Sequence, residues 1–352
     1  MESAIGPDEG REATIAGEAS VEPGPGRKTT MRAIVYYRYG SPDVLELQDV
    51  DIPLVGDDNV LLRVRAASVN PYDWHFMRGE PIIARPMLGG IAKPKVTRLG
   101  VDVAGEVVAV GSNVEEFRPG DEVFGVCSGA FAEYAVAGES SLALKPANVS
   151  FEQAGAVGIA AFTAIQSLRD WGQVRPGQKV LINGAAGGVG TFAVQLAKFW
   201  GAEVTAVCST RNIDMVRSIG ADHVVDYTME DFAGGRERYD LLLDIVGNRS
   251  LSTCRQILTP RGIFVMIGGP KGRWIRPLDR ILRALVSSPF VSQKTISRTA
   301  AWSKQDLVLM RDLMEAGKVT SVIDRTYSLS EVPEAVRYLE EGHARGKVGI
   351  VI

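Results

Sequence analysis

Cysteine and histidine are scarce in this chain of 352 residues, with three of each. A disulfide framework needs paired cysteines at regular spacing, and none stand in a C-x-x-C pair. A structural zinc site needs about four Cys or His ligands close together, and no such cluster occurs. We therefore expect no metal and a reducing, cytoplasmic compartment. The scattered residues are Cys127, Cys208, Cys254, His75, His223 and His343.

Basic charge and long apolar runs are also lacking. The net charge of −3 provides no basic field, so nucleic acid is not an expected partner. No apolar run reaches the ~18 residues of a membrane span. Residues 1–30 are rich in Gly, Pro, Glu, Ala and Ser and carry neither a secretion signal nor an acid-poor transit peptide. We expect this segment to be a disordered tail.

The most informative stretch is KVLINGAAGGVGTFAVQLAK, residues 179–198. A short apolar strand, a glycine turn and an apolar-periodic helix form the first half of a dinucleotide-binding βαβ unit. Bare backbone at Gly187 and Gly188 would admit a diphosphate to the helix N-terminus, and Gly190 would let helix and strand pack closely. Because Ala185 replaces the usual first glycine, a purely structural turn or another nucleotide ligand stays open.

The end of the next strand, residues 203–208, indicates which dinucleotide would bind. An acid there would bind the ribose 2′-hydroxyl of NAD. The sequence instead reads Cys-Ser-Thr-Arg-Asn over residues 208–212, without a carboxylate. Hydroxyls and the Arg211 guanidinium suit a 2′-phosphate. This favours NADPH, unless Arg211 is only the solvated start of the next helix.

The pattern of elements predicts a two-part α/β protein. Short strands with Gly/Pro turns fill residues 31–150, a β-rich domain. Strands and helices alternate from residue 151, after a capping box at Ser150 and Gln153, as in a doubly wound parallel sheet. Residues 304–352 hold two helices and a last strand, which we expect to dock on the first domain.

Several motifs then occur in a family order. They are SVNPYD (68–73), LGVDVAG (99–105), RPGDEVF (118–124), AAGGVG (185–190), GAD (220–222) and GK (346–347). The chain resembles the zinc-free quinone oxidoreductase branch of the medium-chain dehydrogenase/reductases over residues 31–352. The resemblance implies a GroES-like catalytic domain (31–150 and 304–352), an inserted Rossmann domain (151–303), NADPH between them and a homodimer.

The resemblance also indicates whether the chain binds zinc. Zinc-dependent relatives have a cysteine where this chain has Asn70, and a His-Glu pair where it has Val101 and Asp102. Their four-cysteine lobe would follow Phe124, where none is present. The resemblance thus agrees with the expectation of no metal.

Site residues follow from the same resemblance. Relatives contact the diphosphate, the 2′-phosphate and the nicotinamide at matching positions, and a lysine common in bacterial members is replaced by Asn212. The cofactor residues implied are Ala186, Gly187, Gly188, Val189, Gly190, Ser209, Arg211, Tyr227, Gly268 and Arg345, and the catalytic ones are Asn70, Tyr72 and Thr163.

Simpler roles stay open for several of these residues. Tyr227 would serve as an edge residue, Thr163 as a helix-backbone partner, and Asn70 as a turn residue. We expect Asp73 to hold loop backbone, and His75 to be a packed or surface imidazole rather than a proton donor.

The predicted function is zinc-independent, NADPH-dependent hydride transfer to a quinone or an α,β-unsaturated carbonyl. The proton would come from water or Tyr72. An ene reductase acting on enoyl-thioesters or haloacrylates is one alternative. A non-catalytic NADPH-binding scaffold or sensor is another. Residues 81–97 and 271–303, which would line the substrate pocket or a subunit contact, match no signature.

Overall fold

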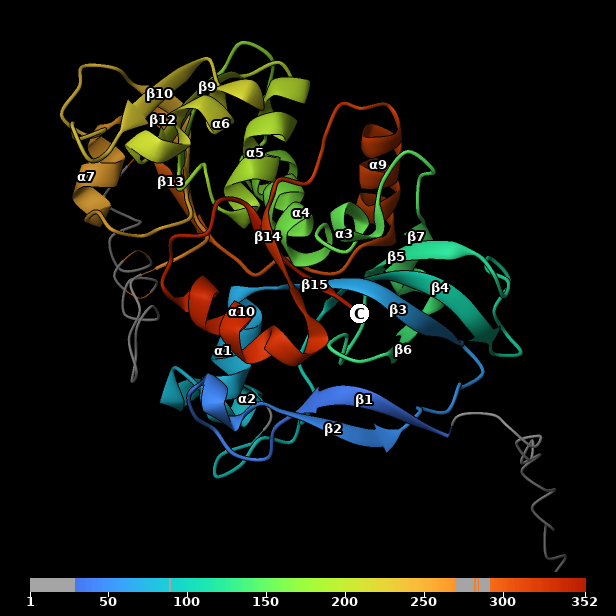
Figure 1. The fold of residues 1–352 in the computed structure, drawn as a ribbon. Helices are drawn as coiled ribbons and strands as arrows, with labels where there is room; N and C mark the ends of the chain where they lie inside the picture. Colours follow the sequence, from blue (N-terminus) through green and yellow to red (C-terminus); the bar gives the residue numbers. More distant parts are fainter. Residues whose placement is uncertain (1–28, 89, 270–281, 283, 285–291) are drawn as a thin grey trace, which may run out of the picture.

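The computed structural model describes residues 29–88, 90–269, 282, 284 and 292–352 (Figure 1). The expectation of a disordered tail, and most of that for residues 271–303, lie outside the described residues. In Figure 1 a parallel sheet lies above a mainly antiparallel one, with α3 (Phe151–Ala154) and α4 (Gly158–Ile165) between them.

The mainly antiparallel sheet is built from both ends of the chain. Its strands follow the order β14-β15-β3-β4-β5-β7, with β6 pairing β3, while β1 and β2 form a separate hairpin. β15 pairs antiparallel with β3, Val348 opposite Val69, so the last strand returns to the first domain as expected. The strands are β1 (Thr30–Val35), β2 (Glu46–Asp51), β3 (Asn59–Val69), β4 (Asp102–Val110), β5 (Glu122–Val126), β6 (Tyr134–Gly138), β7 (Leu142–Leu144), β14 (Ile323–Ser328) and β15 (Lys347–Val351).

The second sheet has six parallel strands in the order β10-β9-β8-β11-β12-β13. Numbered along the chain this is 3-2-1-4-5-6, the doubly wound order, and it confirms the predicted fold class. The strand order reverses between β8 and β11, where such sheets bind ligands at their carboxyl ends. The strands are β8 (Lys179–Asn183), β9 (Glu203–Cys208), β10 (His223–Asp226), β11 (Tyr239–Asp244), β12 (Leu258–Met266) and β13 (Lys294–Ser297).

Helices cover the parallel sheet and flank the cleft between the sheets. Helix α5 follows the glycine turn, and α1 opens at Asn70 with a capping box completed by Asp73. The remaining helices are α1 (Pro71–Arg78), α2 (Arg85–Leu88), α5 (Gly188–Phe199), α6 (Ile213–Ser218), α7 (Leu251–Gln256), α9 (Lys304–Glu315) and α10 (Val332–Glu340).

The ends of the helices are set by two capping boxes. The box predicted at Ser150 and Gln153 is confirmed, and the helical stretch that follows it is divided into α3, α4 and a π-helical turn, Gln166–Trp171. A second box, formed by Ser328 and Glu331, precedes α10, which starts at Val332.

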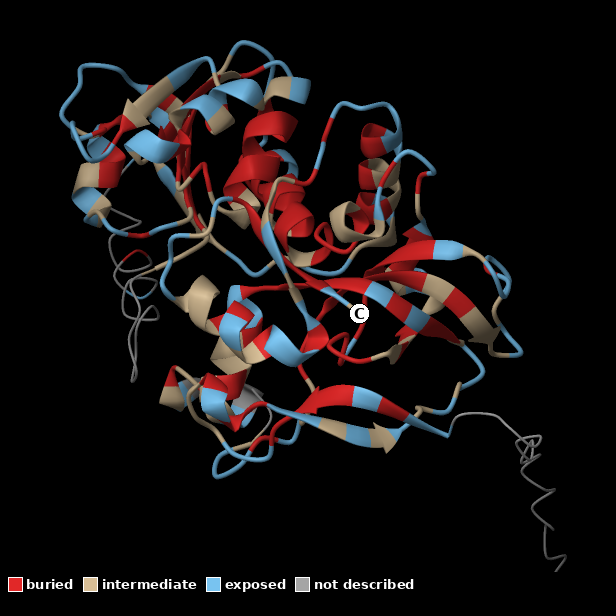
Figure 2. Cartoon of the chain, in the orientation of Figure 1, coloured by how far each residue is buried: buried red, intermediate tan, exposed pale blue. Residues whose placement is uncertain are grey.

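One hydrophobic core joins the two sheets. Phe124 of β5 belongs to the same buried cluster as Phe162 of α4, Phe192 of α5 and Leu307 of α9. Figure 2 shows buried residues running through these helices into both sheets. The walls of the cleft are therefore held by shared packing.

The glycine turn provides a test of this packing. A Cβ at Gly190 would lie 2.1 Å from the Gly184 carbonyl oxygen, whereas one at Gly187 would meet only that oxygen, at 3.6 Å. We expect Gly190→Ala to lower the free energy of unfolding by about 1–3 kcal/mol through overpacking. Gly187→Ala, with an extended φ of −85°, should change it by less than ~0.5 kcal/mol. Urea denaturation followed by circular dichroism measures both, and equal losses would contradict the packing argument.

Candidate active site

Two adjoining cavities lie where the strand order of the parallel sheet reverses. Their volumes are about 340 and 680 Å³, and both are lined by Gly187 and by Ile245, Val246 and Asn248, which follow β11. We call them the smaller and the larger cavity. The glycine turn is thus the point at which they meet.

The turn leaves open space in front of a helix. Gly187 is the N-cap of the twelve-residue α5. Since a Cβ at Gly187 would touch only one atom, the protein's own packing does not require glycine there, and the open space fits a bound group. The N–H groups of the helix N-terminus suit an anion such as a diphosphate. Ala186 lines the smaller cavity, and Gly188 and Val189 line the larger one.

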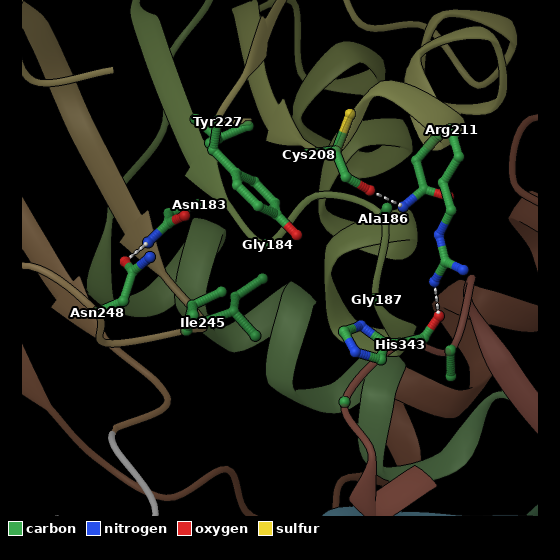
Figure 3. Close-up of a pocket in the computed structure, with 16 residues that line it drawn as sticks. Asn183, Gly184, Ala186, Gly187, Cys208, Arg211, Tyr227, Ile245, Asn248 and His343 are labelled. Carbon is green, nitrogen blue, oxygen red and sulfur yellow. Dashed lines mark hydrogen bonds between the residues drawn. The ribbon is translucent and has the colours of Figure 1, made fainter. Parts of the chain in front are cut away.

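The smaller cavity collects the residues predicted to bind the 2′-phosphate. Ser209, Arg211 and Tyr227 all line it, together with Asn212. In Figure 3 Tyr227 and Arg211 lie on either side of Gly184 and Ala186, and the Arg211 guanidinium donates to the His343 carbonyl oxygen.

Asn212 is buried at the edge of this cavity. Its Nδ2 donates to Ser209 Oγ at 3.1 Å, and its Oδ1 has no hydrogen-bond partner among the described residues. A buried polar atom without a partner is costly. A ribose hydroxyl or adenine amine would satisfy Asn212 Oδ1, so the residues present fit a dinucleotide.

No carboxylate lines the smaller cavity in the described chain. The nearby Asp226, at the end of β10, accepts from Thr210 Oγ1 at 2.5 Å and from Thr228 Oγ1 at 2.7 Å. Hydrogen bonds from Thr210 and Thr228 lower the pKa of Asp226. Both threonines therefore engage Asp226, which ends β10 rather than β9.

The C-terminal loop closes over the glycine turn. Gly346 forms a β-bridge with Gly187, and its N–H donates to the Ala186 carbonyl at 2.8 Å. Arg345, predicted near the cofactor, is exposed and lines neither cavity; its backbone N–H donates to Asp324 Oδ2 at 3.0 Å. The neighbouring residues Gly342 and Ala344 line both cavities instead. Gly190 likewise lines neither cavity and serves packing.

The larger cavity brings together the predicted catalytic residues. Asn70, Tyr72 and Thr163 all line it, as does Gly268. Burial and the Asp73 carboxyl raise the pKa of Tyr72, so its hydroxyl keeps its proton at neutral pH. Thr163 Oγ1 donates to the Ile159 carbonyl at 2.7 Å, the helix-backbone role that stayed open in the sequence.

α1 also contributes an aromatic pair to the larger cavity. The rings of Trp74 and His75 stack with centroids 3.7 Å apart. His75 Nδ1 lies 2.7 Å from the Glu80 carbonyl oxygen. His75 is therefore a packed imidazole on the wall of the larger cavity, one of the two roles expected from the sequence.

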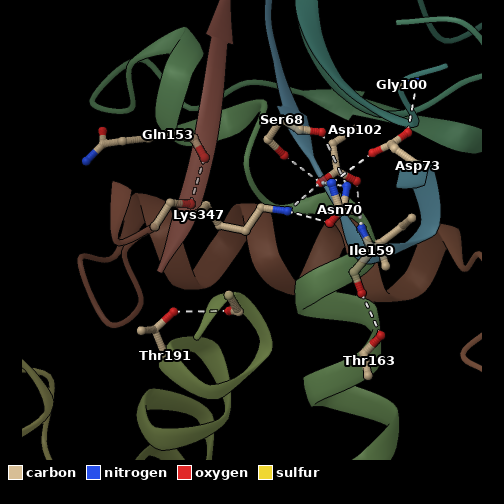
Figure 4. A network of polar contacts seen from close by, with 12 residues as sticks. Ser68, Asn70, Asp73, Gly100, Asp102, Gln153, Ile159, Thr163, Thr191 and Lys347 are labelled. Carbon is tan, nitrogen blue, oxygen red and sulfur yellow. Dashed lines mark hydrogen bonds and ion pairs between the residues drawn. The ribbon is translucent and has the colours of Figure 1, made fainter. Parts of the chain in front are cut away.

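A buried polar network lies beside this cavity (Figure 4). Its centre is Asp102 on β4, which is 0% exposed. The Asp102 carboxylate accepts from Ser68 Oγ at 2.7 Å, Asn70 Nδ2 at 2.9 Å, Lys347 Nζ at 3.0 Å and the Ile159 N–H at 2.8 Å. A Cβ at Gly158 would lie 2.0 Å from Asp102 Oδ1, so glycine there makes room for the carboxylate.

Lys347 is the cation of this network and was missed at the sequence level. Its Nζ donates to Asn70 Oδ1 at 2.6 Å, it is 3% exposed, and it lines the larger cavity. It stands in the GK motif (346–347), at the start of an apolar strand, and the motif by itself assigned it no role. Asp102, also given no role, stands at the start of an apolar run.

Asp73 holds the backbone next to this network, which is the role expected from the sequence. Its Oδ2 accepts from the Asn70 N–H at 2.8 Å and its Oδ1 from the Gly100 N–H at 2.9 Å. Burial raises the pKa of Asp73 to about 7, against the opposing effect of these two N–H groups. Asp73 holds backbone, and lines neither cavity.

Among the described residues, no group of three or more His, Cys, Asp or Glu side chains is arranged to hold a metal ion. Within the same part of the chain, no helix has the length and apolar character to cross a bilayer.

The raised pKa of Asp73 predicts a pH dependence of stability. The unfolded carboxyl loses its proton near 3.8 and the folded one near 7. Between these values the folded state holds the extra proton, so rising pH lowers the free energy of unfolding. Asp73→Asn removes this contribution. Urea denaturation at pH 4.5 to 7.5 should show wild-type stability falling faster than that of the variant, and parallel curves would contradict the assignment.

Comparison with known proteins places the chain in a family. Residues 56–147 match the alcohol dehydrogenase GroES-like domain, and residues 219–350 match the family model described as zinc-binding dehydrogenase. The mitochondrial NAD(P)H oxidoreductase of Bos taurus is 34% identical over 92% of this chain and 90% of its own. The 2-methylene-furan-3-one reductase of Solanum lycopersicum is also 34% identical, over 91% and 79%.

A solved structure supports the same assignment. The quinone oxidoreductase from Coxiella burnetii superposes with a TM-score of 0.81 at 29% identity, over 92% of this chain and 99% of its own. Together with the doubly wound sheet and the glycine turn, these matches confirm the resemblance drawn from the motifs. The chain belongs to the medium-chain dehydrogenase/reductase family, in its quinone oxidoreductase branch, and is an oxidoreductase.

Proposed function

We propose that this oxidoreductase is an NADPH-dependent, zinc-independent reductase of quinones or α,β-unsaturated carbonyl compounds. The observation that carries the proposal is the open glycine turn at Gly187, which lies between the two cavities. Among the described residues, no carboxylate lines the smaller cavity, and apolar and aromatic residues line much of the larger one.

This arrangement supports the proposed cofactor. Gly187 and Gly188 would receive the diphosphate at the N-terminus of α5. Ser209, Arg211 and Tyr227 would surround the 2′-phosphate, and the lack of a carboxylate among the described residues that line this cavity supports NADPH over NADH. The name NAD(P)H oxidoreductase of the Bos taurus relative agrees with a nicotinamide dinucleotide. When bound, this group supplies a hydride.

The substrate class follows from the larger cavity. Ile159, Val189 and Ile267 line it beside Tyr72 and Trp74, which suits a flat, apolar electrophile. Relatives named quinone oxidoreductase and 2-methylene-furan-3-one reductase point to a quinone or a carbon–carbon double bond conjugated to a carbonyl.

The donor set supports independence from zinc. Asp102 already accepts four hydrogen bonds, and the ammonium group of Lys347 lies 3.0 Å from it. A second cation at this place would be repelled by Lys347 and would find no free thiolate or imidazole in the network. Tyr72, whose hydroxyl stays protonated, is the proposed proton donor together with water. The predicted homodimer and cytoplasmic location stay predictions.

The direct test is oxidation of NADPH, followed at 340 nm, with 1,4-quinones, enals, enoyl-CoA and 2-haloacrylate. Turnover of a quinone or enal is the expected result. Preference for enoyl-CoA or the haloacrylate would indicate an ene reductase of different specificity. Tight NADPH binding without turnover of any electrophile would indicate a binding scaffold and overturn the proposal.

A charge placed in the smaller cavity tests the cofactor preference. Ser209→Asp should repel the 2′-phosphate and lower the ratio of kcat/KM for NADPH to that for NADH by about 10-fold or more, since tenfold corresponds to about 1.4 kcal/mol. Ser252→Asp adds the same charge at an exposed position of α7, outside both cavities. This control variant should leave the ratio unchanged. An unchanged ratio in Ser209→Asp would remove the argument for NADPH.

A further inference from the structure

We propose that Lys347 is a catalytic residue, whose ammonium group donates a hydrogen bond to the carbonyl oxygen of the electrophile as negative charge develops there. The inference rests on the proposed reduction of a quinone or an α,β-unsaturated carbonyl. It names the protein group that would stabilise the negative charge on the substrate oxygen.

Counting donors singles out Lys347. An ammonium group has three N–H bonds. Two of those of Lys347 go to Asn70 Oδ1 at 2.6 Å and Asp102 Oδ2 at 3.0 Å. No partner for the third occurs among the described residues. Since Lys347 lines the larger cavity, this third donor is available to a ligand.

The neighbouring polar side chains, Asn70 and Thr163, already donate all of their side-chain hydrogens to other groups of the protein. Both amide hydrogens of Asn70 are engaged, because Nδ2 donates to Asp102 Oδ2 at 2.9 Å and to the Ser68 carbonyl at 3.3 Å. The ammonium group has no acceptor, so Asn70 Oδ1 must face it. Thr163 donates its hydroxyl hydrogen to the Ile159 carbonyl. Asn70 therefore positions Lys347 and has no donor left for the substrate.

The electrostatics favour an anion beside Lys347. The single negative charge of Asp102 is shared among four donors, so it neutralises the ammonium group only in part. At 3% exposure, Lys347 lies where water screens little. A positive charge held in advance at such a place stabilises a developing oxyanion without reorganisation.

The stem of Lys347 places its charge next to the cofactor site. A Cβ at Gly188 would lie 2.9 Å from Lys347 Cδ, so the stem runs over the glycine turn. The N–H of Gly346 is bonded to the Ala186 carbonyl. Figure 4 shows the side chain reaching from β15 toward Asn70 and Asp102. The charge is therefore fixed between the expected diphosphate and the larger cavity.

The step balances without a further reactant. A carbon of the electrophile accepts hydride with its electron pair, the carbon–carbon π pair shifts, and the carbonyl π pair moves onto oxygen. The resulting enolate carries one negative charge beside Lys347. When the electrophile is a quinone, a proton then moves from the new CH2 carbon to the second carbonyl oxygen, which gives the hydroquinone monoanion. Water or Tyr72 then supplies one proton, and the cofactor leaves oxidised by two electrons.

A purely structural ion pair between β15 and β4 is the competing explanation. Lys347→Met removes the charge, and Lys145→Met is the matched control. The Lys145 side chain is also buried, at 5% exposure, and pairs with Glu122 outside both cavities. Both variants should lose stability. Only Lys347→Met should lower kcat by about 100-fold or more among folded molecules, with the Kd for NADPH changing less than threefold.

The loss should also depend on the substrate. A strongly electron-accepting quinone needs less help than a simple enal, so the fall in kcat for Lys347→Met should be larger with the enal. A structural role would lower both rates equally. An equal loss, or a kcat matching that of Lys145→Met, would overturn the inference while leaving the proposed function standing.

A binding measurement keeps the test independent of turnover and of variant folding. 4-Nitrophenol added to the wild-type complex with NADP⁺ reports its ionisation by absorbance near 400 nm. The ammonium group should lower the pKa of the bound phenol below its solution value, and Lys347→Met should abolish the shift. An unshifted or unbound phenol in the wild type would overturn the inference. A shift without turnover of any electrophile would instead support the anion site and reject the proposed function.

Discussion

The pairing of β15 with β3 is the constraint on which the site depends. It brings the end of the chain back across the first sheet, so that Gly346 bridges to Gly187 and Lys347 enters the cleft. Without this pairing the glycine turn would belong to one sheet and the buried carboxylate of Asp102 to the other, related only by the shared core and by the Ile159 N–H that donates to Asp102. One antiparallel strand pair therefore sets both the separation of the cavities and the placement of charge between them.

Much of the fold could be predicted from local sequence. The apolar run before the glycine turn and the alternation of strands and helices after Ser150 are period signals that neighbouring residues carry by themselves. They led correctly to the doubly wound sheet, whereas Ser209, Arg211 and Tyr227 of the smaller cavity were indicated by the motif after β9 and by the resemblance. The ends of helices were less predictable, because α3 stops at Ala154 and α4 begins only at Gly158 within a single Ala-rich stretch.

The buried network could not be predicted in the same way. Asp102 and Lys347 are ordinary in their local contexts, and their meaning comes from a contact between strands at opposite ends of the chain. Arg345 and Lys347 stand two positions apart, yet Gly346, at a φ of +90°, turns the chain so that the first is exposed and the second buried. The resemblance had shown that zinc-dependent relatives have a cysteine at the position of Asn70 and a His-Glu pair at the positions of Val101 and Asp102. The structure shows an ammonium group bonded to both side chains.

The central place of β15 also has a consequence for biosynthesis. β3 pairs with β4 and β6, which follow it soon in the sequence, but its residues 66–69 pair with β15, which is made after nearly all of the described chain. A short stretch of strand edge therefore stays open while the intervening residues are made, and open edges invite pairing with other chains. Long-range pairing of this kind also folds slowly. The pairing of β3 is thus completed only once β15 has been made.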